Sequence, residues 1–472
     1  MATYKNLRKV LNLPTLSASP SSGVNGEMYF NTTDSALFIY DGAWKKVTQS
    51  AIPGPDWTAT TQQAILQASD AEASDKFGYS VGIDGDTLIV GAFLEDTAGT
   101  NAGAAYVFTR SGTSWSQQAK LQSSDIEAVD VFGSSVAIDG DTVVVGARAE
   151  DTGGTDAGSA YIFTRSGTSW SQQAKLQSSD IQAGDIFGSS VTIEGDTVVV
   201  GAYLEDTGGT SAGAAYVFTR SGTSWSQQAK IQSSDISAGD NFGRYSLHLN
   251  SNTLVVGAHN ENKTGAIDGA GSAYVFTRSG TSWSQQAKLV ASDASQGSSF
   301  GQSVAIDGDT IVVGAHKEST VVVNGGAAYI FTRSGTTWSQ QARIISSDVT
   351  AWPAAGSVTN SLGYASEFGF QVSIEGDTVI VAAPKNNEET YPGDGYHAGA
   401  GYIFTRSGTS WTEVEKLTAS NWDDGTGTGT LRLAIGQSLA MSNKTVVLCS
   451  TRARDPVSNA YDAGAAYTFL AG

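Results

Sequence analysis

One stretch of the sequence recurs along most of the chain. Its clearest copy runs from Phe132 to Asp180 and begins with Phe-Gly. The copies begin at Phe77, Phe132, Phe187, Phe242, Phe300, Phe368 and, with Ile in place of Phe, Ile435. Successive starting points are 55, 55, 55, 58, 68 and 67 residues apart. Seven copies at such a period indicate a propeller or a solenoid, because one copy alone cannot bury its apolar face.

Each copy contains four runs that are typical of β-strands. In the second copy the runs are Phe132–Ile138, Thr142–Ala147, Ser159–Thr164 and Ser169–Gln177. They are rich in β-branched and aromatic residues, and Asp139-Gly140 marks a tight hairpin between the first two. No helical pattern separates the runs. The sequence therefore predicts an all-β fold, a seven-bladed β-propeller of four-stranded antiparallel blades.

The two ends of the repeat region complete each other. Trp57–Ser69 matches a fourth strand, Trp115–Ser124, yet it precedes the first Phe-Gly. The seventh copy stops after its third strand, Tyr467–Phe469. We predict that the N-terminal strand completes the last blade and closes the ring. The predicted domains are an N-terminal module (residues 1–50), a linker (51–56) and the propeller (57–472).

The repeated motifs resemble a known family. Phe132-Gly133, Gly146-Ala147 and the Ala160–Phe163 strand resemble the FG-GAP repeat of the integrin α-chain propeller and its bacterial relatives. Calcium-binding blades of that family carry a long loop rich in Asp and Asn between their first two strands. This chain has only Asp-Gly or Glu-Gly there, and Ca²⁺ needs about six to eight oxygen ligands. We predict no metal site and no cofactor.

The segment before the repeats predicts a small β-meander. Gly26–Val47 contains the alternating runs Glu27–Asn31 and Ala36–Tyr40, followed by Ala43–Val47. It resembles N-terminal segments of tail-fibre and appendage proteins of marine bacteriophages, although a generic hairpin would give the same pattern. Met1–Leu13 lacks the apolar core of a secretory signal. We therefore expect a virion protein, assembled in the host cytoplasm in multiple copies and attached to other virion proteins through residues 1–50.

Composition excludes several classes of partner. The chain has 46 acidic and 27 basic residues and a net charge of −19, so nucleic acid is not an expected partner. No apolar run reaches the length of a membrane helix, so we expect no membrane insertion. The single cysteine, Cys449, excludes an intrachain disulfide.

Residues that recur in every regular copy are predicted to be structural. We expect the Phe of Phe-Gly to pack between blades and its Gly to admit a close neighbour. We expect the repeated Trp to cover the outer strand, and we interpret the Arg that ends strand three as an edge charge. The excess length of later copies follows strands two and four. These strands end at the same pole, which we call the top face; the short turns form the bottom face.

The top loops of copies six and seven carry the candidate ligand-binding residues. Exposed aromatic rings beside carboxamides and carboxylates suit sugar binding, because rings stack on sugar faces and polar groups bond hydroxyls. The alternative is that these rings pack their own long loops. The candidates are Trp352, Tyr364, Asn386, Asn387, Tyr391, Asp394, Tyr396, His397, Trp422, Asp423 and Asp424.

Two further sets of polar residues could in principle bind a metal ion. Acidic residues in the top loops could hold divalent cations, but a solvated acidic rim is the expected state. The residue after each Gly-Ala varies: Phe93, Arg148, Tyr203, His259, His316, Pro384 (after Ala-Ala) and Thr451 (after Cys-Ser). We expect the two histidines to be surface residues rather than metal ligands.

The sequence predicts a binding protein. No catalytic motif is present, so no catalytic residue is assigned. We expect the propeller to bind a host-surface receptor, a glycan or a protein, through the top loops of blades six and seven. The alternatives are a glycan-degrading enzyme, since Asp423 and Asp424 could do glycosidase work, and a structural virion decoration without receptor binding.

Overall fold

The computed structural model divides the chain into two compact units, Met1–Ala59 with Ala471–Gly472, and Thr60–Leu470. Each unit is described by itself. The residues described are 56–262, 268–319, 324–348, 366–386, 398–420, 433–453 and 462–472, together with the backbone of four short strands before residue 47.

The four N-terminal strands form one sheet. They are β1 (Thr15–Leu16), β2 (Met28–Asn31), β3 (Ala36–Tyr40) and β4 (Trp44–Lys46). β2, β3 and β4 pair antiparallel in succession, which confirms the predicted meander. The sequence did not predict β1, which pairs parallel to β2. The same unit contains a short 3₁₀ helix, η2 (Trp57–Ala59).

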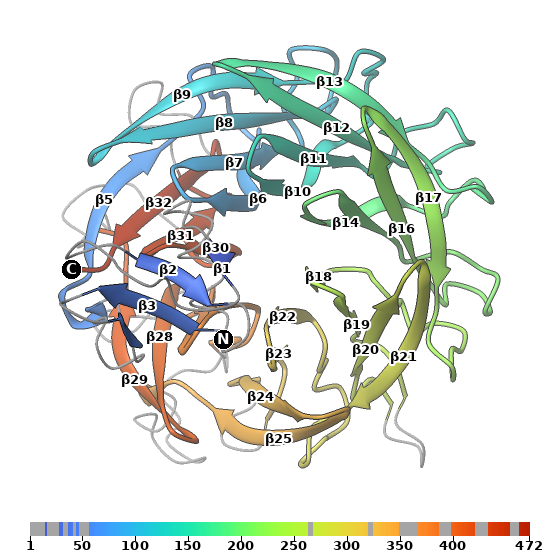
Figure 1. Cartoon of the computed structure of the whole chain (residues 1–472). Coiled ribbons are helices and arrows are strands. Elements are labelled where there is room, and N and C mark those ends of the chain that lie inside the picture. Colours follow the sequence, from blue (N-terminus) through green and yellow to red (C-terminus); the bar gives the residue numbers. More distant parts are fainter. Residues whose placement is uncertain are drawn as a thin grey trace, which may run out of the picture. The chain divides into compact units, whose positions relative to one another are not determined.

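The larger unit is a seven-bladed propeller, as predicted (Figure 1). Blade 1 consists of β6 (Phe77–Asp84), β7 (Thr87–Ala92), β8 (Ala104–Ser111) and β9 (Ser114–Leu121). Blade 2 consists of β10 (Phe132–Asp139), β11 (Thr142–Ala147), β12 (Ser159–Ser166) and β13 (Ser169–Leu176). Blade 3 consists of β14 (Phe187–Glu194), β15 (Thr197–Ala202), β16 (Ala214–Ser221) and β17 (Ser224–Ile231).

The remaining blades follow the same plan. Blade 4 consists of β18 (Leu247–Asn250), β19 (Thr253–Ala258), β20 (Ser272–Ser279) and β21 (Ser282–Leu289). Blade 5 consists of β22 (Ser303–Asp307), β23 (Thr310–Ala315), β24 (Ala327–Ser334) and β25 (Thr337–Ile344). Blade 6 consists of β26 (Gln371–Glu375), β27 (Thr378–Ala383), β28 (Ala400–Ser407) and β29 (Ser410–Leu417). Blade 7 consists of β30 (Ser438–Ser442), β31 (Thr445–Ser450), β32 (Ala465–Leu470) and β5 (Thr61–Leu66).

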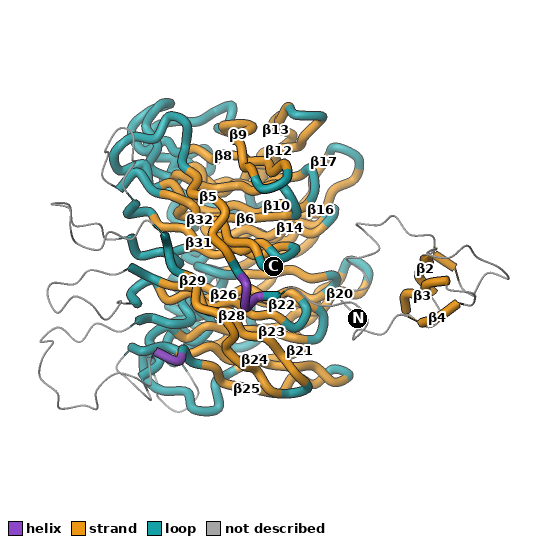
Figure 2. Tube along the Cα trace, turned by 90° about the vertical axis from the view of Figure 1, so that its left-hand side faces the viewer, coloured by secondary structure: helices purple, strands orange, loops and turns teal. Residues whose placement is uncertain are grey.

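The N-terminal strand closes the ring. β5 pairs antiparallel with β32, with Leu66 opposite Ala466 and Thr61 opposite Leu470. The pairing therefore joins strands from the two ends of the chain, as the sequence predicted. Leu470, the last residue of β32, also lies opposite Thr445, which is at the bottom end of β31. The chain therefore enters and leaves the propeller at its bottom face. The longer described loops gather on the opposite side (Figure 2).

The strand order explains the burial of each repeated segment. The first strand of each blade is innermost and the fourth is outermost (Figure 1). All six residues of β11, Thr142–Ala147, are buried, because this strand has a neighbour on each edge and a blade against each face. The β-branched run suits such a strand. The hairpin before it uses Gly140-Asp141 as its loop, one residue later than the predicted Asp-Gly, and Gly140 has a φ of 58°.

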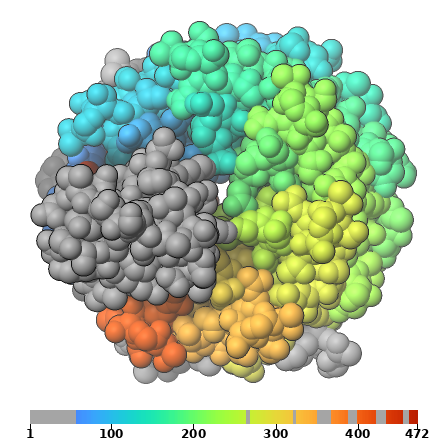
Figure 3. Space-filling model, viewed as in Figure 1, coloured from blue at the N-terminus to red at the C-terminus, as the bar shows by residue number. Residues whose placement is uncertain are grey.

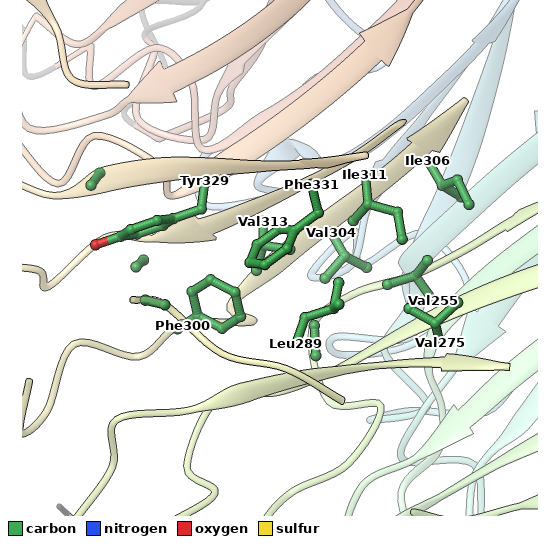
Figure 4. Packing of buried hydrophobic residues seen from close by; sticks show 14 residues of the cluster. Val255, Val275, Leu289, Phe300, Val304, Ile306, Ile311, Val313, Tyr329 and Phe331 are labelled. Atoms are coloured by element: carbon green, nitrogen blue, oxygen red, sulfur yellow. The ribbon is translucent and has the colours of Figure 1, made fainter. Parts of the chain in front are cut away.

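The repeated Phe packs between blades, as predicted. Phe300 of blade 5 is fully buried with Val275 and Leu289 of blade 4 (Figure 4). Its ring centre lies 5.5 Å from that of Tyr329 and 6.0 Å from that of Phe331. Six blade junctions repeat this arrangement, so the aromatic residues provide much of the apolar contact that holds neighbouring blades together.

The Gly after the repeated Phe admits a close neighbour in every blade that begins with Phe-Gly except blade 4, as predicted. A Cβ on Gly133 would lie 2.3 Å from the carbonyl oxygen of Ala104 in blade 1. Gly133 also has a φ of 88°, which L-residues rarely adopt. Any larger residue would therefore push blade 2 away from blade 1.

The repeated Arg and Trp join neighbouring blades. Arg165 bonds Asp141 in its own blade and Thr87 in the preceding blade, and its guanidinium lies 5.2 Å from the ring centre of Trp170. Trp170 Nε1 donates to Gln118 on the outer strand of blade 1 at 2.8 Å. The Arg residues are thus only 12–21% exposed where ion-paired, which corrects their interpretation as simple edge charges.

No helix in the described residues is long and apolar enough to cross a membrane.

Candidate ligand-binding site at the mouth of the central channel

Most blades pair the acidic residues of their top loops with a cation. Lys175 Nζ lies 2.8 Å from Asp125 Oδ2, 2.9 Å from Glu150 Oε1 and 5.6 Å from the ring centre of Tyr161. Burial alone would raise the pKa of Glu150, but hydrogen bonds from Lys175 and nearby hydroxyl groups hold it below its usual range. Four further blades repeat the pairing: Lys120 with Asp70 and Glu95, Lys230 with Asp180 and Glu205, Lys288 with Asp235 and Glu261, Arg343 with Asp293 and Glu318.

These pairs explain the acidic top face. The carboxylates stabilise the junction between a top loop and the outer strand instead of forming an open ring of ligands. Within the described ranges, no group of three or more His, Cys, Asp or Glu side chains could hold a metal ion.

Asn386 is the one predicted ligand-binding residue that lies in the described part of the chain. It occupies the place of Glu150 in blade 6, is 4% exposed, and donates from Nδ2 to the Tyr402 hydroxyl at 2.8 Å. Its nitrogen also lies 3.4 Å from Asp348 Oδ2, which bonds Lys416. These contacts place Asn386 inside the polar cluster of its blade, away from the surface.

The other ten predicted residues lie outside the described residues. They are Trp352, Tyr364, Asn387, Tyr391, Asp394, Tyr396, His397, Trp422, Asp423 and Asp424.

The innermost strands surround a central channel of about 720 Å³ (Figure 3). Its described lining contains Arg244 and Lys317 and three of the four histidines of the chain, His248, His259 and His316. None of the described lining residues is Asp or Glu, although the chain has 46 acidic and 27 basic residues. The channel wall therefore differs in charge from the protein as a whole.

A local insertion in blade 4 gives the channel mouth its chemistry. The last residue of β14, Glu194, lies opposite Thr197, and the last residue of β18, Asn250, lies opposite Thr253. Counted from Phe187 and Phe242, blade 4 therefore has one extra residue. The inner strand β18 has only four residues, and the chain bends at residues 242–246, where Arg244 and Tyr245 line the channel.

Aromatic and cationic side chains meet at this mouth. The Arg244 guanidinium lies 4.7 Å from the ring centre of Tyr203 and 4.6 Å from that of Tyr245. The Tyr245 ring lies 4.9 Å from His259. On the blade 1 side, Tyr79 and Phe93 have ring centres 4.2 Å apart. Tyr79 and Tyr245 are 39% and 43% exposed, so part of each side chain is accessible to a ligand.

The histidines of the mouth are buried, which corrects their prediction as surface residues. His259 and His316 are 7% and 6% exposed. Burial lowers the pKa of His259 to about 3, with Arg244 and Lys317 contributing. Burial, with the charge of Lys317 contributing, likewise lowers the pKa of His316 to about 3. Both rings are therefore neutral at pH 7.

Comparison with known families agrees with this architecture. The FG-GAP repeat model matches residues 60–108, 115–163, 170–218, 225–276 and 283–331, which together exceed half of the chain. The chain belongs to the FG-GAP repeat family. Each match begins on an outer strand and ends on the third strand of the next blade, so the match crosses each blade junction. No curated protein matches the chain.

Sequence reasoning missed this FG-GAP channel mouth, although a signal was present. Arg244-Tyr245-Ser246 replaces the Ser-Ser-Val of blades 2 and 3, and the period lengthens from 55 to 58 at this copy. The residues that follow each Gly-Ala also differ from blade to blade. Only the closed ring brings these variable positions together around the mouth of the channel.

Proposed function

We propose that this FG-GAP propeller is a non-enzymatic binding protein that attaches to a glycan at the mouth of its central channel. The observation that carries the proposal is the cluster of accessible aromatic rings beside hydrogen-bonding groups. Tyr79 and Tyr245 can stack on the apolar face of a sugar, while Arg244 and the exposed Asn260 can bond its hydroxyl groups.

The position of the mouth suits attachment. The chain enters and leaves the propeller at the bottom face, and the mouth of the channel lies at the top face. A protein held through its N-terminal residues would thus present the mouth outward. In the setting that residues 26–47 suggest, residues 1–50 contact other virion proteins and the glycan belongs to the host surface.

Binding of the full chain to a glycan array tests the proposal. Tyr79→Ala with Tyr245→Ala should reduce the strongest signals at least tenfold, since losing ~1.4 kcal/mol of stacking is sufficient. Ile65→Ala is the matched control, because Ile65 is also 39% exposed but lies on the outer strand β5. Its signal should equal that of the wild type.

Assays on the same glycans distinguish a binding protein from an enzyme and from a structural protein. Release of reducing sugar from a bound polysaccharide would indicate an enzyme. Absence of binding to every glycan would leave a structural role and would refute the proposal. The described channel lining has no carboxylate to act as a glycosidase acid or base, so we expect binding without release.

A further inference from the structure

We propose that the mouth of the central channel is an anion subsite, in which Arg244 and Lys317 bind a carboxylate or sulfate group of an acidic glycan. The inference rests on the proposed function and adds the chemical class of the ligand. It follows from the charge of the wall, from unpaired polar atoms and from the position of the aromatic rings.

The cations of the mouth lack carboxylate partners in the described structure. Arg244 Nη1 has a long contact of 3.4 Å with the neutral Asn241 Oδ1, and no ion pair forms at Arg244 or Lys317 among the described residues. By contrast, Lys175 and Lys385 are ion-paired at 2.8 Å and 2.6 Å. Two cations without an ion pair among the described residues, in a chain of net charge −19, are suited to an external anion.

Arg244 and Lys317 share one neighbour on the channel wall. Both act on the buried ring of His259, whose low pKa reflects burial first and then the charges of Arg244 and Lys317. Both also line the same channel. An acidic glycan in the channel can therefore meet cations from both blade 4 and blade 5.

A buried polar atom at the same mouth also lacks a partner. His316 is 6% exposed and lines the channel, and its Nδ1 makes no hydrogen bond to the described residues. A neutral imidazole can carry its proton on Nδ1 and donate it to an oxygen. Because this nitrogen has almost no exposed surface, it would reach a bound carboxylate or sulfate only if the channel wall moved.

Below the described lining of the channel, which contains no Asp or Glu, carboxylates are found at the bottom face. Carboxylates end the inner strands at the bottom face and accept hydrogen bonds from turn N–H groups of the next blade: Asp84 from Gly140, Asp139 from Gly195, Asp307 from Gly376, Glu375 from Asn443. The field along the axis therefore favours an anion at the top mouth and disfavours it at the bottom.

The rings beside the cations specify a sugar rather than a free ion. The face of Tyr245 lies next to Arg244, and Tyr79 is exposed on the blade 1 side. A channel of about 720 Å³ accommodates several sugar units. A uronic-acid or sulfated residue would place its ring on a tyrosine and its charge on Arg244 and Lys317.

Immobilised polysaccharides test the inference on the full chain. The probes are polygalacturonate, which carries carboxylates, heparin, which also carries sulfates, and uncharged dextran. We expect binding to one or both anionic polymers, at least tenfold tighter than to dextran and weakened by added salt. Arg244→Gln with Lys317→Gln should reduce that binding at least tenfold without changing the melting temperature.

Lys444→Gln is the control, because it removes one positive charge at a bottom turn, away from the channel mouth. It should leave binding unchanged. Equal loss in this control and in the double variant, or equal binding of single-stranded DNA, would overturn the inference. Binding to neutral glycans that depends on Tyr79 and Tyr245 but not on Arg244 and Lys317 would refute the anion subsite alone. Binding to no glycan would refute both proposals.

Discussion

Replacing Lys175 by Ile should destabilise the propeller, and the structure gives the size of the effect. Lys175 is the cation for Glu150, whose side chain is only 5% exposed. Removing one partner of a buried pair costs about 3–5 kcal/mol. Ser159 and Gln177 still bond Glu150, so we expect a smaller loss than this range, about 2–3 kcal/mol.

The expected change in melting temperature is small but measurable. The propeller spans Thr60–Leu470, and unfolding entropy of about 2.1 cal/mol/K per residue gives roughly 0.9 kcal/mol/K for it. Lys175→Ile should therefore lower the melting temperature by about 2–4 °C in calorimetry. Asp125→Asn is the control: Asp125 is 43% exposed, and such pairs contribute at most about 1 kcal/mol.

The protein itself supplies the compensating variant. Blade 7 has Ile65 opposite Tyr467, where blade 2 has Lys175 opposite Tyr161, and Ala453 stands in the place of Glu150. Lys175→Ile with Glu150→Ala should thus be more stable than Lys175→Ile alone, because no buried charge is left unpaired. An unchanged melting temperature in the single variant, or a lower one in the double variant, would refute this reasoning.

Three further predictions concern closure, pH and metals. Deleting residues 1–55 should leave a cooperatively melting propeller, whereas deleting residues 1–70 should expose the edge of β32 and cause aggregation; equal melting temperatures would contradict ring closure. Burial raises the pKa of Asp75, Asp130 and Asp240 to about 6, so these groups stabilise the native state fully below pH 3.8 and lose that contribution as pH rises through 6. The melting temperature should be higher at pH 5 than at pH 7.5, and Asp130→Asn should narrow the difference; a wider difference would show that the sign is wrong. EDTA should leave the melting temperature unchanged, because no group of three or more His, Cys, Asp or Glu in the described residues could hold a metal ion; a fall of several degrees would reveal a metal site.

The blades act as internal controls for one another. Blades 2 and 3 keep Ser-Ser where blade 4 has Arg244 and Tyr245, and this substitution leaves the packing of Phe242 intact, since its ring centre still lies 5.8 Å from that of Tyr274. Variation at the mouth is therefore compatible with the fold. This independence allows residues of the mouth to be changed without loss of stability.

The sequence by itself determined the architecture, because the fold depends on local patterns that repeat. The residue pattern of the strands and Gly140 in its hairpin act within one blade. The Phe-Gly pairs act between blades that follow one another in the sequence. The count of seven copies and the unpaired strand Trp57–Ser69 were sufficient to predict closure. Even the role of Gly133 followed, since only Gly permits both its φ of 88° and its close contact.

The tertiary structure alone decided which residues meet. Lys175 bonds Asp125 and Glu150, which lie 50 and 25 residues earlier, and no local pattern states such a pairing. The channel mouth combines Tyr79 with Tyr245 and Lys317, from blades 1, 4 and 5. In the sequence, each of these three residues appears as an isolated departure from the repeat, because neighbouring blades place them far apart along the chain. Closing the ring brings the same position of every blade around one axis, and only then do scattered substitutions form one site.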